Sequence, residues 1–409
     1  MIARLQSAPA DAAVCVVGGG PAGLLLARLL YQAGIDCVVL EAKDRTYVEH
    51  RQRAGVLEQA TVDTLRSCGA AQRLDREGLV HHGIELRWNG RSHRIDFPSL
   101  TGGRNVWVYA QTEVVKDLIA LQLADGPPLL FEANVTAITG ADTDRPVVHY
   151  THDGIARSLV CDYVAGCDGS HGVVSAAIPA EALRTFERVY PYSWFGILAD
   201  VPPSCDELIY AHSPRGFALH SMRSRTVSRL YLQVPNGTDP ASWTDEQIWD
   251  ELEARLTIAG GWKLTRGPII QRAVLPLHSC VTEPMSWGRI LLAGDAAHIV
   301  PATGAKGLNL AAADVVVLAR AFAQWAVTGS SAALDAYSDA CLRRVWRAEH
   351  FSWFMTTTLH TAPGQSAFDT RLQLAQLDRI AASTHAAAEL AENYVGLPID
   401  GRPAGVQSQ

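Results

Sequence analysis

The sequence predicts a mixed α/β fold with a parallel sheet, a separate antiparallel sheet and a helical C-terminal part. A short apolar run at residues 14–17 is followed by a glycine-rich turn and by a Leu/Ala-rich stretch that ends near Gly34. Between about residues 185 and 280, short strand-like runs alternate with large aromatic residues, which is typical of an antiparallel sheet. After Leu308 the apolar spacing is helical almost to the end of the chain.

The N-terminal segment predicts a dinucleotide-binding unit of the Rossmann type. Gly18, Gly20 and Gly23 separate the first strand from a helix, residues 35–40 form a second strand, and Glu41 follows it. Glycines in this turn let the helix N-terminus approach a pyrophosphate, and an acid after the second strand accepts hydrogen bonds from ribose hydroxyls. We therefore expect these four residues to contact a dinucleotide.

Two further predicted strands end in a pair of one glycine and one aspartate, Gly294-Asp295 and Asp168-Gly169. The apolar run at residues 290–293 leads into Gly294 and Asp295, and a second run ends just before Asp168. Ligands of parallel sheets bind beyond the carboxyl ends of the strands, and three such ends suit an extended dinucleotide such as FAD. Asp295 would accept a ribityl hydroxyl, and the helix that begins near Leu308 would direct its positive end toward the flavin.

The remaining pattern defines the domain organisation. Residues 84–88 and 92–97 predict a hairpin around Asn89-Gly90, and residues 112–125 predict a helix. Residues 131–139, 147–151 and 157–163 predict three consecutive antiparallel strands. We expect an FAD-binding domain from residues 12–80, 103–184 and 281–315, a substrate-binding sheet domain from 81–102 and 185–280, and a helical region, 316–409, that forms a subunit interface.

Composition excludes several functional classes. The 409 residues carry a net charge of -7, so the basic surface typical of nucleic-acid binding is not expected. Apolar stretches are broken by Gly, Asp or Arg, and no signal-peptide pattern precedes residue 14, so we expect a cytoplasmic protein without a membrane span. The eight cysteines form no Cys-x-x-Cys pair and His81-His82 has no matching ligands, so no metal is expected.

Polar residues in the antiparallel segment predict a binding site for a small acid. Ser221 and Arg223 are two positions apart on a strand and share one face, as do Arg229 and Tyr231, and Tyr210 lies on the preceding strand. A planar guanidinium with two hydroxyl donors suits a carboxylate. The alternative is that these arginines are solvated strand residues, but few acids lie nearby to pair with them.

Several motifs resemble one family closely. The chain resembles the single-component FAD-dependent aromatic hydroxylases from about residue 12 to 399, and within them the 4-hydroxybenzoate 3-monooxygenase (para-hydroxybenzoate hydroxylase) family. The combination of Tyr210, Ser221-x-Arg223, Tyr231 and Tyr394 is the most specific part of this resemblance. The other matching segments are residues 18–23, 53–59, 109–113, 167–169, 214–219, 294–298 and 392–398.

The resemblance assigns roles to individual residues. Ser221, Arg223 and Tyr231 would hold a substrate carboxylate, while Tyr210 would bind the phenol oxygen and Tyr394 would relay its proton toward His81. Met222 and Ala302 would also line the substrate site, and Arg229 would affect the position of the flavin. The residues implied in FAD binding are Gly18, Gly20, Ala22, Gly23, Glu41, Arg51, Gln52, Arg53, Ala54, Gly55, Val56, Gln111, Asp168, Asp295, Leu308 and Asn309.

The resemblance also implies a reaction. NADPH or NADH would reduce FAD, O2 would form a flavin C4a-hydroperoxide, and 4-hydroxybenzoate would become 3,4-dihydroxybenzoate. Removal of the phenol proton through the two tyrosines would make the ring electron-rich at the position that is attacked. The expected partners are therefore a small aromatic acid, O2 and NAD(P)H, and a homodimer is expected.

Some departures from the family pattern leave alternatives open. Ala302 stands where the family has a second proline, which motivates a related substrate such as 4-aminobenzoate. Lys43, Arg45 and Tyr47 suit the 2′-phosphate of NADPH, whereas Ala42 and Glu49 argue against it, and His278 replaces a common arginine. A flavin-bound ligand sensor without turnover is a third reading, which the tyrosine pair disfavours.

Overall fold

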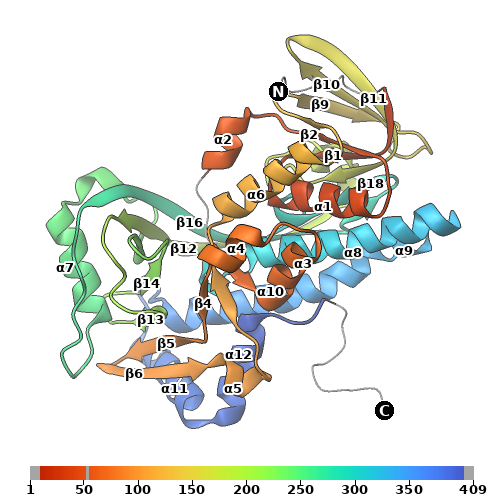
Figure 1. Ribbon diagram of the computed structural model, residues 1–409. Coiled ribbons are helices and arrows are strands. Elements are labelled where there is room, and N and C mark those ends of the chain that lie inside the picture. Colours follow the sequence, from red (N-terminus) through yellow and green to blue (C-terminus); the bar gives the residue numbers. More distant parts are fainter. Residues whose placement is uncertain (1–9, 52–54, 400–409) are drawn as a thin grey trace.

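The structure is a computed structural model that describes residues 10–51 and 55–399. Its first eight-stranded sheet forms the upper part of the molecule in Figure 1. Its central strands are parallel, and three further strands pair with them or with one another in antiparallel fashion. The strand order is β17 (Ser286–Trp287), β18 (Ile290–Leu292), β11 (Ile155–Gly166), β1 (Asp11–Val17), β2 (Cys37–Leu40) and β8 (Leu129–Leu130); β10 (Val147–His152) also pairs with β11, and β9 (Asn134–Thr139) pairs with β10.

Four parallel strands of this sheet end in register. Val17 at the end of β1 lies opposite both Leu40 of β2 and Gly166 of β11, and Gly166 lies opposite Leu292 of β18. The segments that follow the strands therefore leave the same edge of the sheet side by side. This confirms the predicted Rossmann-type parallel sheet and explains how residues far apart in the chain reach one site.

Helix α1 (Pro21–Gln32) follows the glycine-rich turn. Pro21 occupies its first turn, where a missing N–H is harmless, and its leucines and alanines are buried against the sheet and against α6 (Gln111–Ala124) and α8 (Gly307–Thr328). The helix ends where Gly34 adopts a φ of +72°, a conformation that favours glycine. Helix α1 therefore runs from the glycine-rich turn at the end of β1 to Gly34.

Helix α8 crosses the middle of the molecule (Figure 1) and is apolar nearly all round. It is the one helix in the described ranges that is long and apolar enough to cross a membrane, yet 61% of its most apolar window is buried inside the protein. It packs against α1 and against α10 (Tyr337–Leu359). Packing in the protein core therefore accounts for its composition.

The second sheet is antiparallel except for one pair. Its strand pairs are antiparallel from β16 through β14, whereas β13 and β5 run parallel. Asn89 and Gly90 both have positive φ in the turn between β5 and β6, which confirms the predicted hairpin. The order is β19 (His298–Ile299), β16 (Ile269–Glu283), β12 (Arg184–Ala199), β15 (Ser228–Pro235), β14 (Ala218–Met222), β13 (Leu208–His212), β5 (Gly83–Trp88) and β6 (Arg91–Asp96).

The two faces of this sheet bury different side chains because strand residues alternate in direction. One face packs Phe195, Ile197 and their neighbours against Trp249 and the other apolar residues of α7 (Asp245–Leu256). The other face carries Trp194 and Tyr210, which join a core that includes the C-terminal helices. The aromatic face is therefore turned toward the interior of the molecule.

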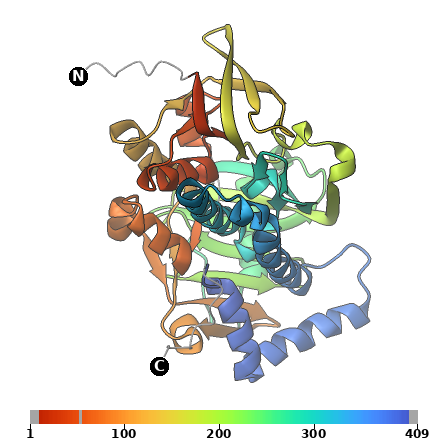
Figure 2. The ribbon, with the colours of Figure 1, turned by 90° about the vertical axis from the view of Figure 1, so that its right-hand side faces the viewer.

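A small third sheet and the C-terminal helices complete the fold. The sheet consists of β3 (Val56–Glu58), β7 (Val106–Val108) and β4 (Leu79–His81), with the short helices α2 (Arg45–His50), α3 (Gln59–Ser67), α4 (Gln72–Glu77) and α5 (Phe97–Thr101) nearby in the chain. Figure 2 shows the C-terminal helices descending to the lower end of the molecule. They are α9 (Ala332–Asp335), α10, α11 (Ala367–Ala382) and α12 (Thr384–Val395).

The mixed α/β class with C-terminal helices is confirmed, and several element bounds are corrected. The strand predicted from residue 35 begins at Cys37, and the one from 131 begins at Asn134; within the segment predicted as an antiparallel sheet, the strand-like run from Gly216 forms a strand only from Ala218. Gly216 has a φ of +106° in a turn, so the strand starts after it. The predicted domain boundaries stay a prediction.

Candidate active site

One cavity of about 860 Å³ extends from the edge of the parallel sheet to the aromatic face of the antiparallel sheet. It brings together most of the residues singled out in the sequence, although they come from both sheets and from α6 and α8. Gln52, Arg53 and Ala54 lie outside the described residues. The predicted residues that line it are Gly18, Gly20, Ala22, Glu41, Arg51, Gly55, Val56, Gln111, Asp168, Tyr210, Ser221, Met222, Arg223, Tyr231, Asp295, Ala302 and Leu308.

The glycine-rich turn forms one end of the cavity. A Cβ on Gly23 would lie 1.9 Å from the carbonyl oxygen of Gly18, so the helix can approach the turn only without a side chain there. A Cβ on Gly20 would meet nothing within 4 Å. No side chain caps the N-terminus of α1, so its first N–H groups and positive dipole end are available for an anion such as a pyrophosphate.

Glu41 lies beside this turn at the end of β2. Its carboxylate accepts hydrogen bonds from the backbone N–H groups of Gly19, at 2.6 Å, and of Lys43, at 2.8 Å. A carboxylate offers about four lone-pair positions, so two remain for ligand hydroxyls. The turn thus holds the acid where the predicted ribose would lie.

The other two strand ends place a second and a third acid at the cavity. Asp168 Oδ2 accepts a hydrogen bond of 3.0 Å from Val174 N–H, whereas the buried Oδ1 has no partner among the described residues. Burial raises the pKa of Asp168. Asp295 is exposed to the cavity in a short 3₁₀ turn, η4 (Gly294–Ala296). An unpartnered buried oxygen and an exposed carboxylate suit a ligand rich in hydroxyl groups.

The side chain of Asn309, in the first turn of α8, forms its hydrogen bonds with other residues of the protein. Its Oδ1 accepts from Glu58 N–H at 2.9 Å and from the Thr61 hydroxyl at 2.8 Å, and its Nδ2 donates to the carbonyl oxygens of Val56 and Ala305. Neither Asn309 nor Gly23 lines the cavity. Asn309 therefore ties β3 to α8, and its contact with FAD stays a prediction.

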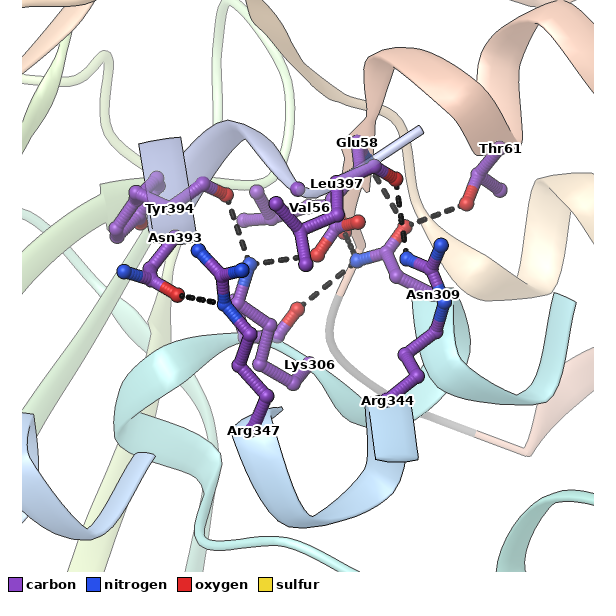
Figure 3. A network of polar contacts seen from close by, with 12 residues as sticks. Val56, Glu58, Thr61, Lys306, Asn309, Arg344, Arg347, Asn393, Tyr394 and Leu397 are labelled. Atoms are coloured by element: carbon purple, nitrogen blue, oxygen red, sulfur yellow. Dashed lines mark hydrogen bonds and ion pairs between the residues drawn. The ribbon is translucent and has the colours of Figure 1, made fainter. Parts of the chain in front are cut away.

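A buried ion pair lies next to this network (Figure 3). Lys306 Nζ donates to Glu58 Oε1 at 2.6 Å and to the backbone carbonyl oxygen of Tyr394 at 2.9 Å. Burial lowers the pKa of Lys306, while Glu58 counteracts that effect. Lys306 also lines the cavity, so the pair joins the α8 end of the site to the helix that carries Tyr394.

At the antiparallel sheet, Arg223 is the half-buried cation of the cavity wall. It follows directly after β14 rather than lying within it, and its Nη2 donates to the Thr112 hydroxyl of α6 at 2.7 Å. Burial and the nearby Arg229 lower its pKa. The Arg229 guanidinium lies 5.3 Å from the centre of the Tyr231 ring. Guanidinium and hydroxyl groups therefore line the same wall, as a carboxylate site requires.

Tyr210 and Tyr394 form a buried hydroxyl pair. Their oxygens are 2.7 Å apart, and both side chains are 1% exposed. The Tyr394 ring stacks on Phe97, with ring centres 5.1 Å apart. Burial raises the pKa of both phenols, so neither is a free base at neutral pH. Tyr210 lines the cavity, whereas Tyr394 joins the site through Tyr210.

His81 is buried in β4, and its ring nitrogens have no hydrogen-bond partner among the described residues. Burial lowers its pKa to about 4. It does not line the cavity, and its place in a proton relay stays a prediction.

Three features of the site were not predicted from the sequence: Lys306, Thr112 as a partner of Arg223, and Trp194 as a cavity residue. A lone lysine between Ala305 and Gly307 in an apolar stretch is the signal that could have pointed to Lys306. The other two carry no signal of this kind, since a helix-opening threonine and a strand tryptophan are common.

Comparisons with known proteins agree with this site. The model of the FAD binding domain family matches residues 11–352. A p-hydroxybenzoate hydroxylase of Acinetobacter baylyi is 49% identical over 387 residues, covering 95% of this chain and 96% of the relative. A 3-(3-hydroxy-phenyl)propionate/3-hydroxycinnamic acid hydroxylase of Shigella sonnei is 25% identical over 75% of this chain and 54% of the relative.

Solved structures share the fold. The crystal structure of a p-nitrophenol 4-monooxygenase from Pseudomonas putida has a TM-score of 0.80 at 20% identity, covering 94% of this chain and 98% of that one. A ternary complex of aklavinone-11 hydroxylase with FAD and aklavinone has a TM-score of 0.71 at 18% identity, covering 87% of this chain and 70% of that one.

The fold, the cavity and these similarities define an FAD-dependent aromatic monooxygenase. Within that class, the chain belongs to the p-hydroxybenzoate hydroxylase family.

Proposed function

We propose that this protein hydroxylates 4-hydroxybenzoate at the 3-position to give 3,4-dihydroxybenzoate, using O2 and NADPH or NADH. One observation carries the proposal. Tyr210, whose hydroxyl is paired with that of the buried Tyr394, lines the same cavity as Arg223, so an aromatic acid can be held at both ends. The 49% identical relative that bears the name of this activity supports it.

FAD would lie along the parallel-sheet end of the cavity. The residues suited to hold it are the turn from Gly18 to Ala22, the carboxylate of Glu41, and the acids Asp168 and Asp295. Arg51, Gly55, Val56, Gln111 and Leu308 line the rest of this region and would complete the contacts. When bound and reduced, FAD supplies the activation of O2.

The antiparallel-sheet end would hold the substrate. Arg223, with the hydroxyls of Ser221 and Tyr231, would bind the carboxylate, and Met222 and Ala302 would line the ring. The phenol O–H at the para position would then donate a hydrogen bond to the Tyr210 hydroxyl. The aromatic walls would exclude water from the reacting end, which would protect an activated oxygen species from decay.

The tyrosine pair would move the proton rather than store it. Because burial raises the pKa of both phenols, a proton that enters at Tyr210 is matched by one that leaves from Tyr394. His81, with a pKa of about 4, is uncharged at neutral pH and would pass a proton on without retaining it. Loss of the phenol proton raises electron density ortho to the oxygen.

We propose that either NADPH or NADH is the hydride donor. Ala42, Lys43 and Tyr47 line the cavity, with the Lys43 ammonium 5.7 Å from the centre of the Tyr47 ring. Arg45 instead pairs with Glu49 at 2.6 Å. A 2′-phosphate would therefore meet Lys43 before Arg45, and direct comparison of NADPH with NADH decides between them.

We also propose a cytoplasmic homodimer. All eight cysteines are free, as is usual in a reducing compartment. The C-terminal helices expose Trp346, Trp353, Phe368 and Leu372, which are large apolar side chains suited to a subunit contact. Sedimentation equilibrium of the FAD-loaded protein measures the mass of the assembly, and a monomer at micromolar concentration contradicts the dimer.

The decisive experiment identifies the product. The purified FAD-loaded protein is incubated with 4-hydroxybenzoate, 4-aminobenzoate and ring-substituted analogues, each with NADPH and with NADH, and the products are analysed by mass spectrometry. The proposal expects 3,4-dihydroxybenzoate in proportion to the nicotinamide oxidised. Preferred oxygenation of 4-aminobenzoate would select the related-substrate alternative, and binding without any oxygenated product would select the sensor.

A further inference from the structure

His360, the residue after the last turn of α10, is buried beneath the substrate end of the cavity. Its ring is 1% exposed and stacks with Phe217 and Tyr192, with ring centres 4.2 Å and 4.8 Å away. Its two nitrogens each have one hydrogen-bond partner. Nε2 is 2.7 Å from the indole Nε1 of Trp194, and Nδ1 is 2.9 Å from the carbonyl oxygen of Thr356.

These two partners fix the protonation of the ring. An indole N–H can only donate, so Nε2 of His360 must carry a lone pair, and a carbonyl oxygen can only accept, so Nδ1 must carry the proton. The imidazole is therefore neutral and held in a single tautomer. Burial agrees with this assignment, because it lowers the pKa of His360 to about 3.

Trp194 is the residue that this arrangement controls. It lies on β12, lines the cavity, and contacts Tyr231 with ring centres 4.7 Å apart. Because its N–H is directed to His360, the indole presents ring surface rather than a hydrogen-bond donor to the cavity. The part of the wall formed by the indole therefore has no free donor, which favours an apolar ring there and offers no second site for a carboxylate or hydroxyl.

The same turn of α10 reaches a second wall. The Thr356 hydroxyl donates to the hydroxyl of Thr303 at 2.8 Å, and both residues are fully buried. Thr303 directly follows Ala302, which lines the cavity. The end of α10 is thus bonded to two segments of the cavity wall that are more than a hundred positions apart in the chain.

We propose that His360 is a positioning residue that acts through Trp194 to set the shape and polarity of the substrate wall. This inference rests on the proposed function, because it assumes that an aromatic acid occupies the cavity. His360 does not line the cavity, so its effect on a ligand must pass through the indole.

A double-mutant cycle tests the proposal in the FAD-loaded protein. The dissociation constant of 4-hydroxybenzoate is measured from the change in flavin absorbance for wild type, His360→Leu, Trp194→Phe and the double variant. Removal of the acceptor leaves a buried indole N–H unpaired, so His360→Leu should weaken binding about tenfold. In the Trp194→Phe background, which lacks that N–H, it should weaken binding less than about twofold further.

His360→Gln is the matched variant, because its amide oxygen can still accept the indole hydrogen bond, and it should retain affinity within about threefold. Wild-type affinity in His360→Leu, or losses that multiply in the double variant, would overturn the proposal. If His360→Leu does not bind FAD, nitrogen-15 NMR of the wild-type protein tests the proposal, because it shows which ring nitrogen of His360 carries the proton. A proton on Nε2 would overturn the proposal, since Nε2 could then not accept the indole hydrogen bond. A wild type that binds no benzoate refutes the proposed function instead, and the NMR result still tests the link to Trp194.

Discussion

The hydroxyl oxygens of Tyr210 and Tyr394 lie 2.7 Å apart, although 184 positions separate the two residues in the chain. One is on β13 of the antiparallel sheet and the other is on α12 near the C-terminus. Nothing local holds them together, so the packing of α12 against α5, α11 and the edge strand β6 creates the pair. The proposed reaction depends on that contact, because it connects the para position of a bound substrate to the interior of the protein.

Tyr210→Phe should bind 4-hydroxybenzoate but hydroxylate it about 100-fold more slowly, because the phenol proton loses its route out. Nicotinamide oxidation should continue and yield H2O2 in place of product. Product formed per nicotinamide oxidised is measured together with H2O2. Tyr394→Phe is the matched control, since it removes the second hydroxyl of the same pair. The two losses should not multiply in the double variant, and full coupling in either single variant contradicts the relay.

Arg223→Lys should weaken 4-hydroxybenzoate binding by about 10- to 100-fold, because an ammonium cannot replace a bidentate guanidinium. Titration of the FAD-loaded protein measures the dissociation constant. Phenol, which lacks the carboxylate, should bind both forms equally. Arg272→Lys on β16 is the control, because Arg272 bonds to the carbonyl oxygen of Trp243 and does not line the cavity. An unchanged dissociation constant for the acid would remove Arg223 from the binding site.

Gly23→Ala should destabilise the protein before any cofactor is added. The new Cβ would lie 1.9 Å from the Gly18 carbonyl oxygen, and overpacking of this kind costs about 1–3 kcal/mol. Gly20→Ala should change the stability of the apoprotein by less than about 1 kcal/mol, since nothing lies within 4 Å of its Cβ. Both should weaken FAD binding. Denaturation of the apoprotein and quenching of FAD fluorescence separate the two effects, and equal apoprotein stabilities refute the packing argument.

Glu349→Gln should stabilise the protein at pH 8 and have little effect near pH 4.5. Burial raises the pKa of this α10 carboxyl from its ordinary value of 4.5 to about 7, although the nearby Ser279 and His298 act to lower it. A group with a raised pKa contributes stability below its unfolded pKa and loses that contribution as the pH rises through its folded pKa.

The gain at pH 8 should be about 3 kcal/mol, since one pKa unit corresponds to about 1.4 kcal/mol. Urea denaturation from pH 4.5 to 8 measures it. Glu246→Gln in the exposed first turn of α7 is the matched control, because it removes the same charge from the surface. A stability difference that does not grow with pH contradicts the prediction.

The parallel sheet could be predicted because its signals are local. A strand, a glycine turn, a helix and an acid succeed one another between residues 14 and 41, and each residue acts through its own backbone or its immediate neighbour. The same holds for the hairpin at Asn89 and Gly90, where both positive φ angles demand such residues. Two strands were predicted to begin two residues early, because the apolar residues Ile35 and Phe217 precede Cys37 and Ala218 without belonging to the strands.

The cavity was predicted only as sets of residues. Arg223 and Ser221 could be placed together from their spacing, but the contact of Arg223 with Thr112 on α6 required the two sheets to be assembled. Lys306 and Glu58 lie 248 positions apart and share no local pattern. Spacing along one element predicts which side chains share a face, whereas contact between elements depends on how they pack.

The sequence by itself determined the dinucleotide fold and the residue types of an acid-binding cavity, because glycine turns and strand periodicity are properties of short segments. The tertiary structure alone decided that Lys306 is buried against Glu58 and that His360 directs the indole of Trp194, and it gave the distance between the hydroxyls of Tyr210 and Tyr394, which only the family resemblance had paired. Each of these contacts joins segments with no local constraint between them, so only the burial of their shared apolar surfaces brings the polar atoms within bonding distance.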